Sequence, residues 1–318
     1  MKADLYGLLR ELSEDENARA ELARAGSPDE LAAVAARLAS ARGYDVTPEA
    51  LTRAIAPPEG ELSDAELHTM VGGKGSIDQK LSGDQSVWAF FAYLLDFESG
   101  AVFNDTLDGG DGNDTIWGGF GEDSMLGGDG NDIMDGDDGN DTMYGEEGAD
   151  YMTGGDGDDF MDGGSRNDSL FGQEGDDIMD GGAGNDFVSG GRGDDIMDGG
   201  DGNDTMDGGE GDDSMDGGAG NDNLDGGDGV DTLDGGAGND ILTGGNDRDV
   251  FVFGTDSGRD VITDFIVGYD KLRFEGAESI DDIHVANSDG DTVITYGNTT
   301  IVVQGWELTA KEVWNNRG

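Results

Sequence analysis

Apolar positions in residues 104–245 recur every nine residues, and this period sets the organisation of the chain. Each repeat holds one apolar residue between polar neighbours, and glycines fill most other positions. A polar–apolar–polar segment of this kind predicts one short strand with a single side chain pointing inward. Repetition at a fixed short period indicates a solenoid, in which each unit packs only on its neighbours.

Residues 109–243 form fifteen consecutive units of the pattern G-G-x-G-x-D-x-U-x, where U is apolar, with no insertion. Position 1 is always Gly, position 6 is always Asp, and position 8 is methionine in nine units. The position-6 aspartates are Asp114, Asp123, Asp132, Asp141, Asp150, Asp159, Asp168, Asp177, Asp186, Asp195, Asp204, Asp213, Asp222, Asp231 and Asp240.

The two flanks of the repeat differ from it and from each other. Residues 1–73 are rich in Ala and Leu, and capping signals such as Ser27-Pro28 with Glu30 predict a small α-helical domain. Residues 246–318 alternate β-branched or aromatic residues with polar ones, which predicts a β cap. Strands are expected at 249–253, 260–265, 271–274, 292–296 and 300–303, the last two joined by a hairpin turn at Gly297-Asn298.

Charge narrows the choice of partner. The chain has 73 acidic and 17 basic residues, a net charge of −56, and residues 104–245 alone contain 41 acids against Arg166 and Arg192. Such a surface repels nucleic acid and anionic membranes, so the expected partner is a cation and no nucleic acid. With 34% hydrophobic residues a single large core is not expected, and the absence of cysteine excludes disulfides and thiolate sites.

The repeat fits the chemistry of a hard cation. Ca²⁺ prefers six to eight oxygen ligands from carboxylates and backbone carbonyls. Glycines allow the loop to turn its carbonyls inward, and the position-6 Asp supplies charge. The position-1 glycines taken as site residues are Gly109, Gly118, Gly127, Gly181, Gly190, Gly199, Gly208, Gly217, Gly226 and Gly235.

This nonapeptide resembles the RTX, or hemolysin-type, calcium-binding repeat. The resemblance implies a mainly β fold, a right-handed parallel β-roll in which two units make one turn. Loops eighteen residues apart would then stack and share calcium ions, Asp114 with Asp132 and Asp123 with Asp141. Fifteen loops define at most thirteen such Ca²⁺ sites. Because each unit buries one sizeable side chain, calcium binding and folding are expected to be a single event.

Some units depart from the pattern. Arg166 replaces Gly at position 4 of the seventh unit, and Asp137, Glu146 and Gln173 replace Gly at position 2 of others. The cation at Arg166 competes for the carboxylates, so the weakest calcium occupancy is expected there. The methionines are expected to form an inward core, and a soft-metal or redox role is the alternative.

A Gly-Gly pair at Gly72-Gly73 ends the helical segment. Apolar residues precede this pair at fixed positions. Counting backward with Gly73 as the first position, Met70 is the fourth, Leu67 the seventh and Leu62 the twelfth. This pattern resembles the double-glycine leaders of the nitrogen-fixation-associated class, which ABC exporters with a protease domain remove. It implies cleavage between Gly73 and Lys74. Glu59 lies fifteen positions before the cleavage point, where leaders of this class commonly have an apolar residue. The structural alternative is that the two glycines simply cap the C-terminus of a helix.

Two further segments bear on export and contacts. Residues 246–318 resemble the module that ends many RTX proteins, which implies a type I secretion signal as well as a cap. Residues 74–103 form a linker or amino-terminal cap of the roll, and their aromatic stretch 86–97 is expected either to cap the roll or to touch a membrane or partner.

No catalytic pattern is present in the sequence. His68 and His284 lack a nucleophile or zinc-protease motif around them, so no enzymatic activity is expected. The function indicated is a secreted or cell-surface calcium-binding RTX protein that acts as a structural or surface-interaction module. The alternative is a small exported toxin or bacteriocin with residues 86–97 as its membrane-active element.

Overall fold

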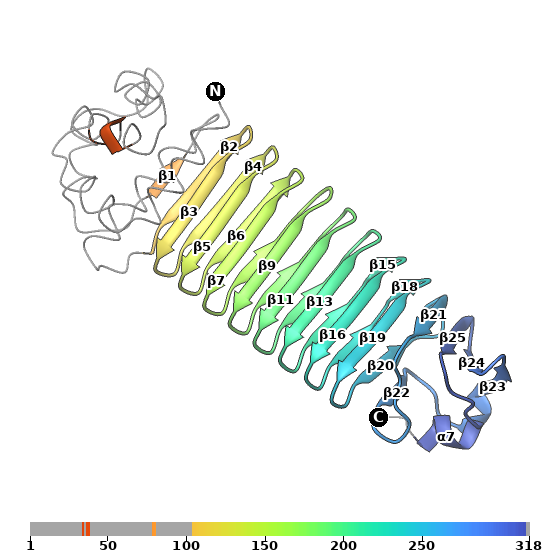
Figure 1. Ribbon diagram of the computed structural model, residues 1–318. Helices are drawn as coiled ribbons and strands as arrows, with labels where there is room; N and C mark the ends of the chain where they lie inside the picture. The colour runs from red at the N-terminus through yellow and green to blue at the C-terminus, as the bar shows by residue number, and fades with distance from the viewer. Residues whose placement is uncertain (1–33, 35, 39–77, 81–103, 316–318) are drawn as a thin grey trace.

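The repeat forms a long, flat solenoid with its two sheets back to back (Figure 1). The computed structural model describes residues 34, 36–38, 78–80 and 104–315. Successive units alternate between the two sheets, so each strand pairs in parallel with the strand eighteen residues on. Met179, for example, is in register with Met161 and Met197. The predicted mainly β roll with two units per turn is confirmed.

Sheet A has eleven strands and receives every second unit. In spatial order its strands are β1 (Asp78–Lys80), β2 (Thr106–Asp111), β4 (Ser124–Asp129), β6 (Thr142–Glu147), β8 (Phe160–Asp162), β10 (Ile178–Asp180), β12 (Ile196–Asp198), β14 (Ser214–Asp216), β17 (Thr232–Asp234), β20 (Val250–Phe253) and β22 (Lys271–Phe274).

Sheet B has twelve strands and receives the intervening units. Its repeat strands are β3 (Thr115–Phe120), β5 (Ile133–Asp138), β7 (Tyr151–Asp156), β9 (Ser169–Glu174), β11 (Phe187–Arg192), β13 (Thr205–Glu210), β16 (Asn223–Asp228) and β19 (Ile241–Asn246). A small third sheet joins β15 (Ala219–Gly220) to β18 (Ala237–Gly238) at the loop edge.

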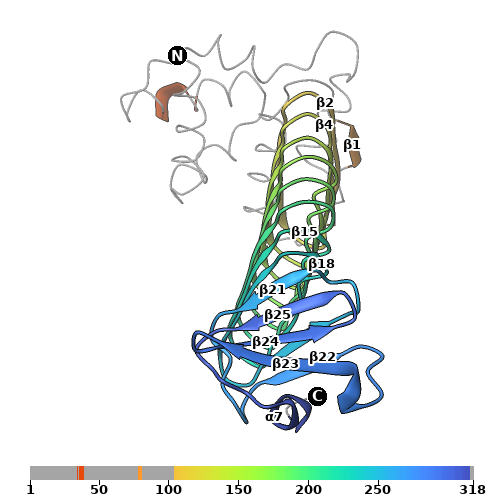
Figure 2. The same ribbon diagram turned by 90° about the vertical axis from the view of Figure 1, so that its right-hand side faces the viewer.

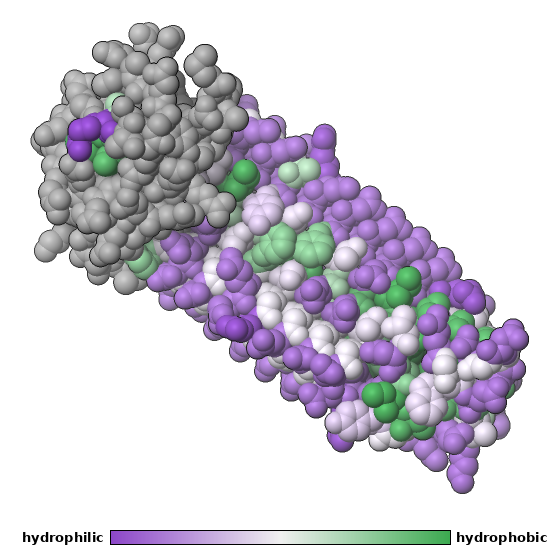
Figure 3. Space-filling model, viewed as in Figure 1, coloured by the Kyte–Doolittle hydropathy of each residue, from purple (hydrophilic) through white to green (hydrophobic). Residues whose placement is uncertain are grey.

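One inward side chain per strand builds the core between the sheets. Position 8 is buried in every unit, and the nine methionines there are at most 2% exposed. Positions 7 and 9 point outward, which is the alternation expected of a pleated strand. Figure 3 shows the sheet B face, with apolar and neutral residues along its middle and hydrophilic residues along both edges. The inward methionine core is therefore confirmed.

Strand length differs from the sequence prediction. The prediction was a three-residue strand at positions 7–9, whereas most sheet B strands run on through positions 1–3. Pairing continues because the backbones of stacked turns keep exchanging hydrogen bonds, as from Gly121 N–H to the Asp138 carbonyl at 2.8 Å.

The carboxyl-terminal residues extend the roll and then cover it (Figure 2). Strand β21 (Arg259–Ile262) continues sheet B, and β25 (Thr299–Val303) pairs with it in parallel. Strands β24 (Asp291–Tyr296) and β23 (Ile283–Ser288) add antiparallel to β25. The segment η1 (Ile280–Asp282) and helix α7 (Ala310–Asn315) complete this part.

The expected strands of this region are present, and the Gly297-Asn298 turn does join β24 to β25. Three elements were not predicted, the segment η1, the strand β23 and the helix α7. Aromatic side chains replace the methionines at this end, with Phe251 and Phe265 ring centroids 6.1 Å apart.

Several predictions concern residues outside those described. Residues 34 and 36–38 are helical. The rest of the helical domain, the Gly72-Gly73-Lys74 junction and residues 86–97 lie outside the described residues. No helix in the described part of the chain is long and apolar enough to cross a membrane.

Candidate metal sites

The position-6 aspartates stack in two columns, one along each edge of the roll. The sheet A column precedes the sheet A strands and runs from Asp105 through Asp123 to Asp270. The sheet B column precedes the sheet B strands and runs from Asp114 to Asp260. Every aspartate in these columns is at most 3% exposed. Asp114 stacks on Asp132 and Asp123 on Asp141, each pair joined by a hydrogen bond from backbone N–H to carboxylate, and the sharing of calcium ions between them stays a prediction.

Each aspartate fixes the turn stacked before it through one carboxylate oxygen. The backbone N–H of one position-6 residue donates to Oδ1 of the aspartate eighteen residues on. The nitrogen–oxygen distance is 2.7 Å from Asp132 to Asp150 and 2.8 Å from Asp177 to Asp195. The carboxylate is thus held in one orientation by the main chain of the neighbouring turn.

The second carboxylate oxygen has no hydrogen-bond partner among the described residues. This holds for Oδ2 of every position-6 aspartate from Asp123 to Asp240, and of Asp260. A buried polar atom without a partner costs about 1–3 kcal/mol, and more when it is charged. A regular series of such atoms is unusual in a native fold and points to a ligand that they would hold.

The position-1 glycines let these oxygens approach the carbonyls of the next turn. A Cβ atom on Gly136 would lie 2.3 Å from Asp141 Oδ2 and 2.4 Å from the carbonyl oxygen of Gly154 on the next turn, which is too close for any side chain. Glycine therefore lets a carboxylate oxygen and a carbonyl oxygen, both hard donors of the kind that Ca²⁺ prefers, come together here. The same convergence of an Asp Oδ2 and a next-turn carbonyl occurs at fourteen position-1 glycines, from Gly109 to Gly226. The residues present therefore fit a calcium ion.

Burial and crowding make these carboxyls hard to ionise without a cation. Desolvation, aided by the aspartates of neighbouring turns, raises the pKa of Asp141, Asp168 and Asp177 to about 8. Desolvation also raises the pKa of Asp195 and Asp231 to about 7. A metal-free roll with all these groups charged would be strongly disfavoured.

The donor set is mixed. Within the described residues, no three acidic or histidine side chains converge as a metal-binding group. A cation held here would thus rest on main-chain carbonyls as well as on aspartate. This agrees with the preference of Ca²⁺ for hard oxygen ligands of both kinds.

Sequence reasoning missed four members of the columns, Asp105, Asp249, Asp260 and Asp270. Each is buried and takes part in the same series of hydrogen bonds from backbone N–H to aspartate Oδ1. All four are followed by x-U-x, as in Asp249-Val-Phe-Val and Asp260-Val-Ile-Thr. That shorter signal would have identified them and would have shown that residues 244–252 form a sixteenth, degenerate unit.

The departures from glycine are strained. Arg166, Glu146 and Gln173 have φ of 82°, 69° and 83°, in the left-handed region that L side chains rarely adopt. The hydrogen bond from Gly148 N–H to the Ser165 carbonyl beside Arg166 is 3.2 Å, whereas that from Gly184 N–H to the Asp201 carbonyl is 2.8 Å. The ladder is lengthened on one side of this turn only, because the Arg166 N–H itself donates to the Ala183 carbonyl at 2.6 Å.

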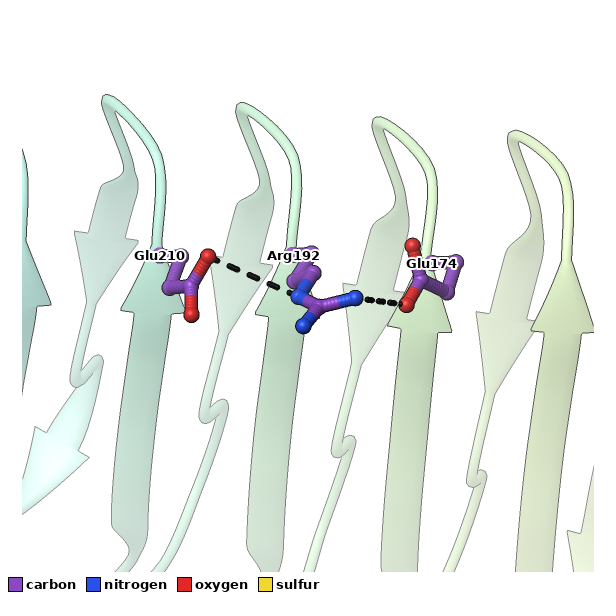
Figure 4. Close-up of polar contacts among 3 residues, drawn as sticks. All are labelled: Glu174, Arg192 and Glu210. Carbon is purple, nitrogen blue, oxygen red and sulfur yellow. Dashed lines mark hydrogen bonds and ion pairs between the residues drawn. The ribbon is translucent and has the colours of Figure 1, made fainter.

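The outer loop positions carry a second, exposed set of polar residues. Next to the sheet B column they are mostly asparagines, and Asn203, Asn221 and Asn239 each donate to the asparagine of the turn before. On strands β9, β11 and β13, Arg192 forms ion pairs with both Glu174 and Glu210 (Figure 4). This arginine offsets repulsion between acids of successive turns.

Comparison with known proteins agrees with this geometry. The family model for the RTX calcium-binding nonapeptide repeat (four copies) matches in eight overlapping segments. Together these span residues 99–262, more than half of the chain.

Among solved structures, the crystal structure of the extracellular lipase LipA from Serratia marcescens is similar, with 22% sequence identity and a TM-score of 0.27. That match covers 57% of this chain and 44% of the lipase chain. No curated protein matches the sequence. On the strength of the repeat match, the chain belongs to the RTX calcium-binding nonapeptide repeat family.

Proposed function

We propose that this calcium-binding repeat protein is secreted and that its roll folds when it meets extracellular calcium. The folded roll then serves as a structural or surface-interaction module. The observation that carries the proposal is the series of buried position-6 aspartates from Asp123 to Asp240, whose Oδ2 atoms lack hydrogen-bond partners among the described residues. The position-1 glycines bring such oxygens close to next-turn glycine carbonyls. Roll domains of this family are typically non-catalytic, in keeping with this role.

We assign the calcium ligands to the position-6 carboxylates and the position-1 carbonyls. The carboxylates are those of Asp114, Asp123, Asp132, Asp141, Asp150, Asp159, Asp168, Asp177, Asp186, Asp195, Asp204, Asp213, Asp222, Asp231 and Asp240. Fourteen convergent glycine positions favour up to fourteen ions, one more than the repeat count alone gives, because residues 244–252 add a loop. Bound calcium would supply positive charge between carboxylates that otherwise repel.

Folding would then follow calcium concentration. The glycine-rich chain loses much entropy on ordering and buries one large side chain per unit, so the metal must supply part of the stability. Low cytosolic calcium would keep the chain unfolded for export, and millimolar calcium outside would fold it. In this proposal residues 1–73 are a leader, 74–103 a linker or cap, 104–245 the roll, and 246–318 a cap that includes the secretion signal.

Calcium titration of the full-length chain tests the first part of this proposal. Far-ultraviolet circular dichroism in a chelator should show little β structure, and calcium should restore it in a saturable transition. Calorimetry in the same samples should give about fourteen ions per chain. An identical β spectrum in chelator and in calcium would refute calcium-coupled folding.

Intact-mass analysis tests the second part. Producing cells and their medium are compared, and a species in the medium that starts at Lys74 would support both export and removal of the leader by an ABC exporter with a protease domain. Full-length protein confined to the cells would refute the secretion proposal while leaving the calcium proposal in place.

A further inference from the structure

The outer face of sheet A carries an apolar lane. We define it as Phe160, Ile178 and Ile196, which stand in register on the successive strands β8, β10 and β12. Tyr144 on β6 is in register with Asp162 and extends the lane diagonally from the neighbouring row. Ile178 is 46% and Ile196 54% exposed, and Tyr144 packs on Phe160 with ring centroids 5.6 Å apart. Contiguous exposed apolar side chains on so charged a protein are a feature of contact surfaces.

An acidic lane runs beside the apolar lane on the same face. It is formed by the position-9 residues of five neighbouring strands, which stand in register. These residues are Asp162, Asp180, Asp198, Asp216 and Asp234. Like charges opposite each other on adjacent strands repel, so the lane is a standing cost that a cationic group would relieve.

The acidic lane is also held in place. Oδ1 of Asp198 accepts a hydrogen bond from the N–H of Gly200 at 3.0 Å. Oδ1 of Asp216 and of Asp234 likewise accepts one from the N–H of the glycine two residues later. The carboxylates therefore form a fixed row at the strand spacing of about 4.8 Å and not a set of mobile side chains.

Sheet B offers an internal contrast. Its outer face has an apolar cluster of Tyr151, Phe171 and Phe187, with ring-centroid distances of 5.2 and 5.4 Å. The strand neighbours in register with these rings include Ser169 and Ser189, not a row of acids. Only sheet A sets an apolar lane beside a continuous acidic lane.

We propose that the outer face of sheet A docks a cationic amphipathic helix of another protein. A helix laid across the strands repeats its side-chain rows every 5.4 Å or so, close to the strand spacing. Its apolar row would cover Ile178 and Ile196, and its Lys and Arg row would lie over the acidic lane. A second copy of this chain is a poor occupant because each copy has a net charge of −56.

The probe is a synthetic helix of about 18 Leu and Lys residues, long enough at about 27 Å to run along the lanes over their successive strands. Its control is a peptide of the same composition in scrambled order. Binding to the full-length, calcium-saturated protein is measured by fluorescence anisotropy at about 0.15 M salt, where long-range attraction is screened. We expect the amphipathic peptide to bind at least about tenfold more tightly than the scrambled one.

Two pairs of matched variants locate the site. Ile178→Ser with Ile196→Ser should weaken binding about tenfold, and Phe171→Ser with Phe187→Ser on sheet B should change it by less than about threefold. Asp180→Asn, Asp198→Asn and Asp216→Asn should likewise weaken binding about tenfold. The matched control makes the same change in charge on the outer loops and should not weaken binding. It combines Asp158→Asn, Asp176→Asn and Asp194→Asn.

Circular dichroism at saturating calcium verifies that every variant has the roll fold, so loss of the fold is not mistaken for loss of the site. The proposal is overturned if the loop variant weakens binding as much as the lane variant, because attraction would then depend on net charge alone. Equal affinity for the scrambled peptide would overturn it as well. Either result would leave the calcium proposal unaffected, since that rests on spectra recorded without peptide.

Discussion

The backbone N–H of Asp159 donates a hydrogen bond to Oδ1 of Asp177, eighteen residues on, with nitrogen and oxygen 2.7 Å apart. Oδ2 of the same Asp177 is buried and has no hydrogen-bond partner among the described residues. One carboxylate thus has two separable functions. Oδ1 holds the neighbouring turn, and Oδ2 is left for the cation that we propose.

Substitutions at Asp177 should separate these two functions. Asn keeps the acceptor at Oδ1 but replaces Oδ2 by an amide NH₂ group, whose nitrogen does not ligate calcium. Asp177→Asn should therefore raise the calcium concentration at the folding midpoint several-fold and lower the stoichiometry of bound ions. Asp177→Ala should cost about 1–3 kcal/mol more, because the Asp159 N–H then loses its partner. Calorimetry and calcium-dependent circular dichroism measure both effects.

The matched control is Asp176→Asn, which removes the same charge from an exposed neighbour in the same loop. It should change the midpoint by less than about twofold. If it shifts the midpoint as far as Asp177→Asn does, general electrostatics and not ligation controls folding.

The roll could be predicted from sequence because its period leaves few alternatives. The apolar position 8, represented by Met179, must point inward in every unit. The eighteen-residue register follows from two units per turn, which the resemblance to the RTX repeat implied. The aspartate pairings were predictable for the same reason. These features depend on local pattern repeated many times, so one exception such as Arg166 does not disturb them.

Features that depend on non-local packing were harder to predict. Strand β23 lies at the edge of sheet B, and its Ile283-His284-Val285 sequence has no strong strand signal of its own. Asp260 and Asp270 keep the position-4 glycine of the repeat, as Gly258 and Gly268, but lack the glycine pair at positions 1 and 2, although they complete the two columns. The acidic lane on the outer face of sheet A could not be predicted, because its members, such as Asp198, occupy position 9 of the repeat, which varies from unit to unit.

Restoring glycine at the strained positions should stabilise the roll. Gln173 has a φ of 83°, and an L residue there costs about 1–2 kcal/mol relative to glycine. Gln173→Gly and Arg166→Gly should each raise the free energy of unfolding at saturating calcium by about 1 kcal/mol. Urea unfolding followed by circular dichroism gives these values.

The reverse substitution provides the control. Gly182 has a φ of 90°, and a Cβ on it would lie 2.3 Å from the Gly164 carbonyl oxygen. Gly182→Ala should therefore destabilise the roll. Equal stability of this variant and the wild type would show that the backbone relaxes freely and that the strain argument is wrong.

Acid should favour the metal-free roll. Burial raises the pKa of Asp141, Asp168 and Asp177 from 3.8 to about 8, so the folded chain binds more protons than the unfolded chain between these values. Stability falls with pH wherever the folded state binds more protons. The free energy of unfolding without calcium should thus rise as the pH falls from about 8 toward 5.

Circular dichroism in a chelator checks this sign. The β signal should grow on acidification from about pH 8 to pH 5 and disappear on return to pH 8. Calcium-saturated protein at pH 8 supplies the reference spectrum of the roll. A chelated chain whose spectrum is the same at both pH values would contradict the prediction.

Calcium should protect the methionines of the core from oxidation. Nine of the eleven methionines fill position 8, and each is at most 2% exposed in the roll. In a chelator the unfolded chain would expose their sulfurs, and hydrogen peroxide would transfer one oxygen atom to each, forming sulfoxide and water. A sulfoxide is too polar for this core, so the oxidised chain should no longer fold when calcium is added.

Mass spectrometry after peroxide treatment with and without calcium counts the oxygens, and circular dichroism measures refolding. A variant with leucine at Met125, Met143, Met161 and Met179 keeps similar side-chain volumes and removes four oxidisable sulfurs. It should recover more of its β signal than the wild type after the same treatment in chelator. If the roll methionines oxidise equally fast with and without calcium, the core is not sealed by metal binding and the coupling of calcium to folding is wrong.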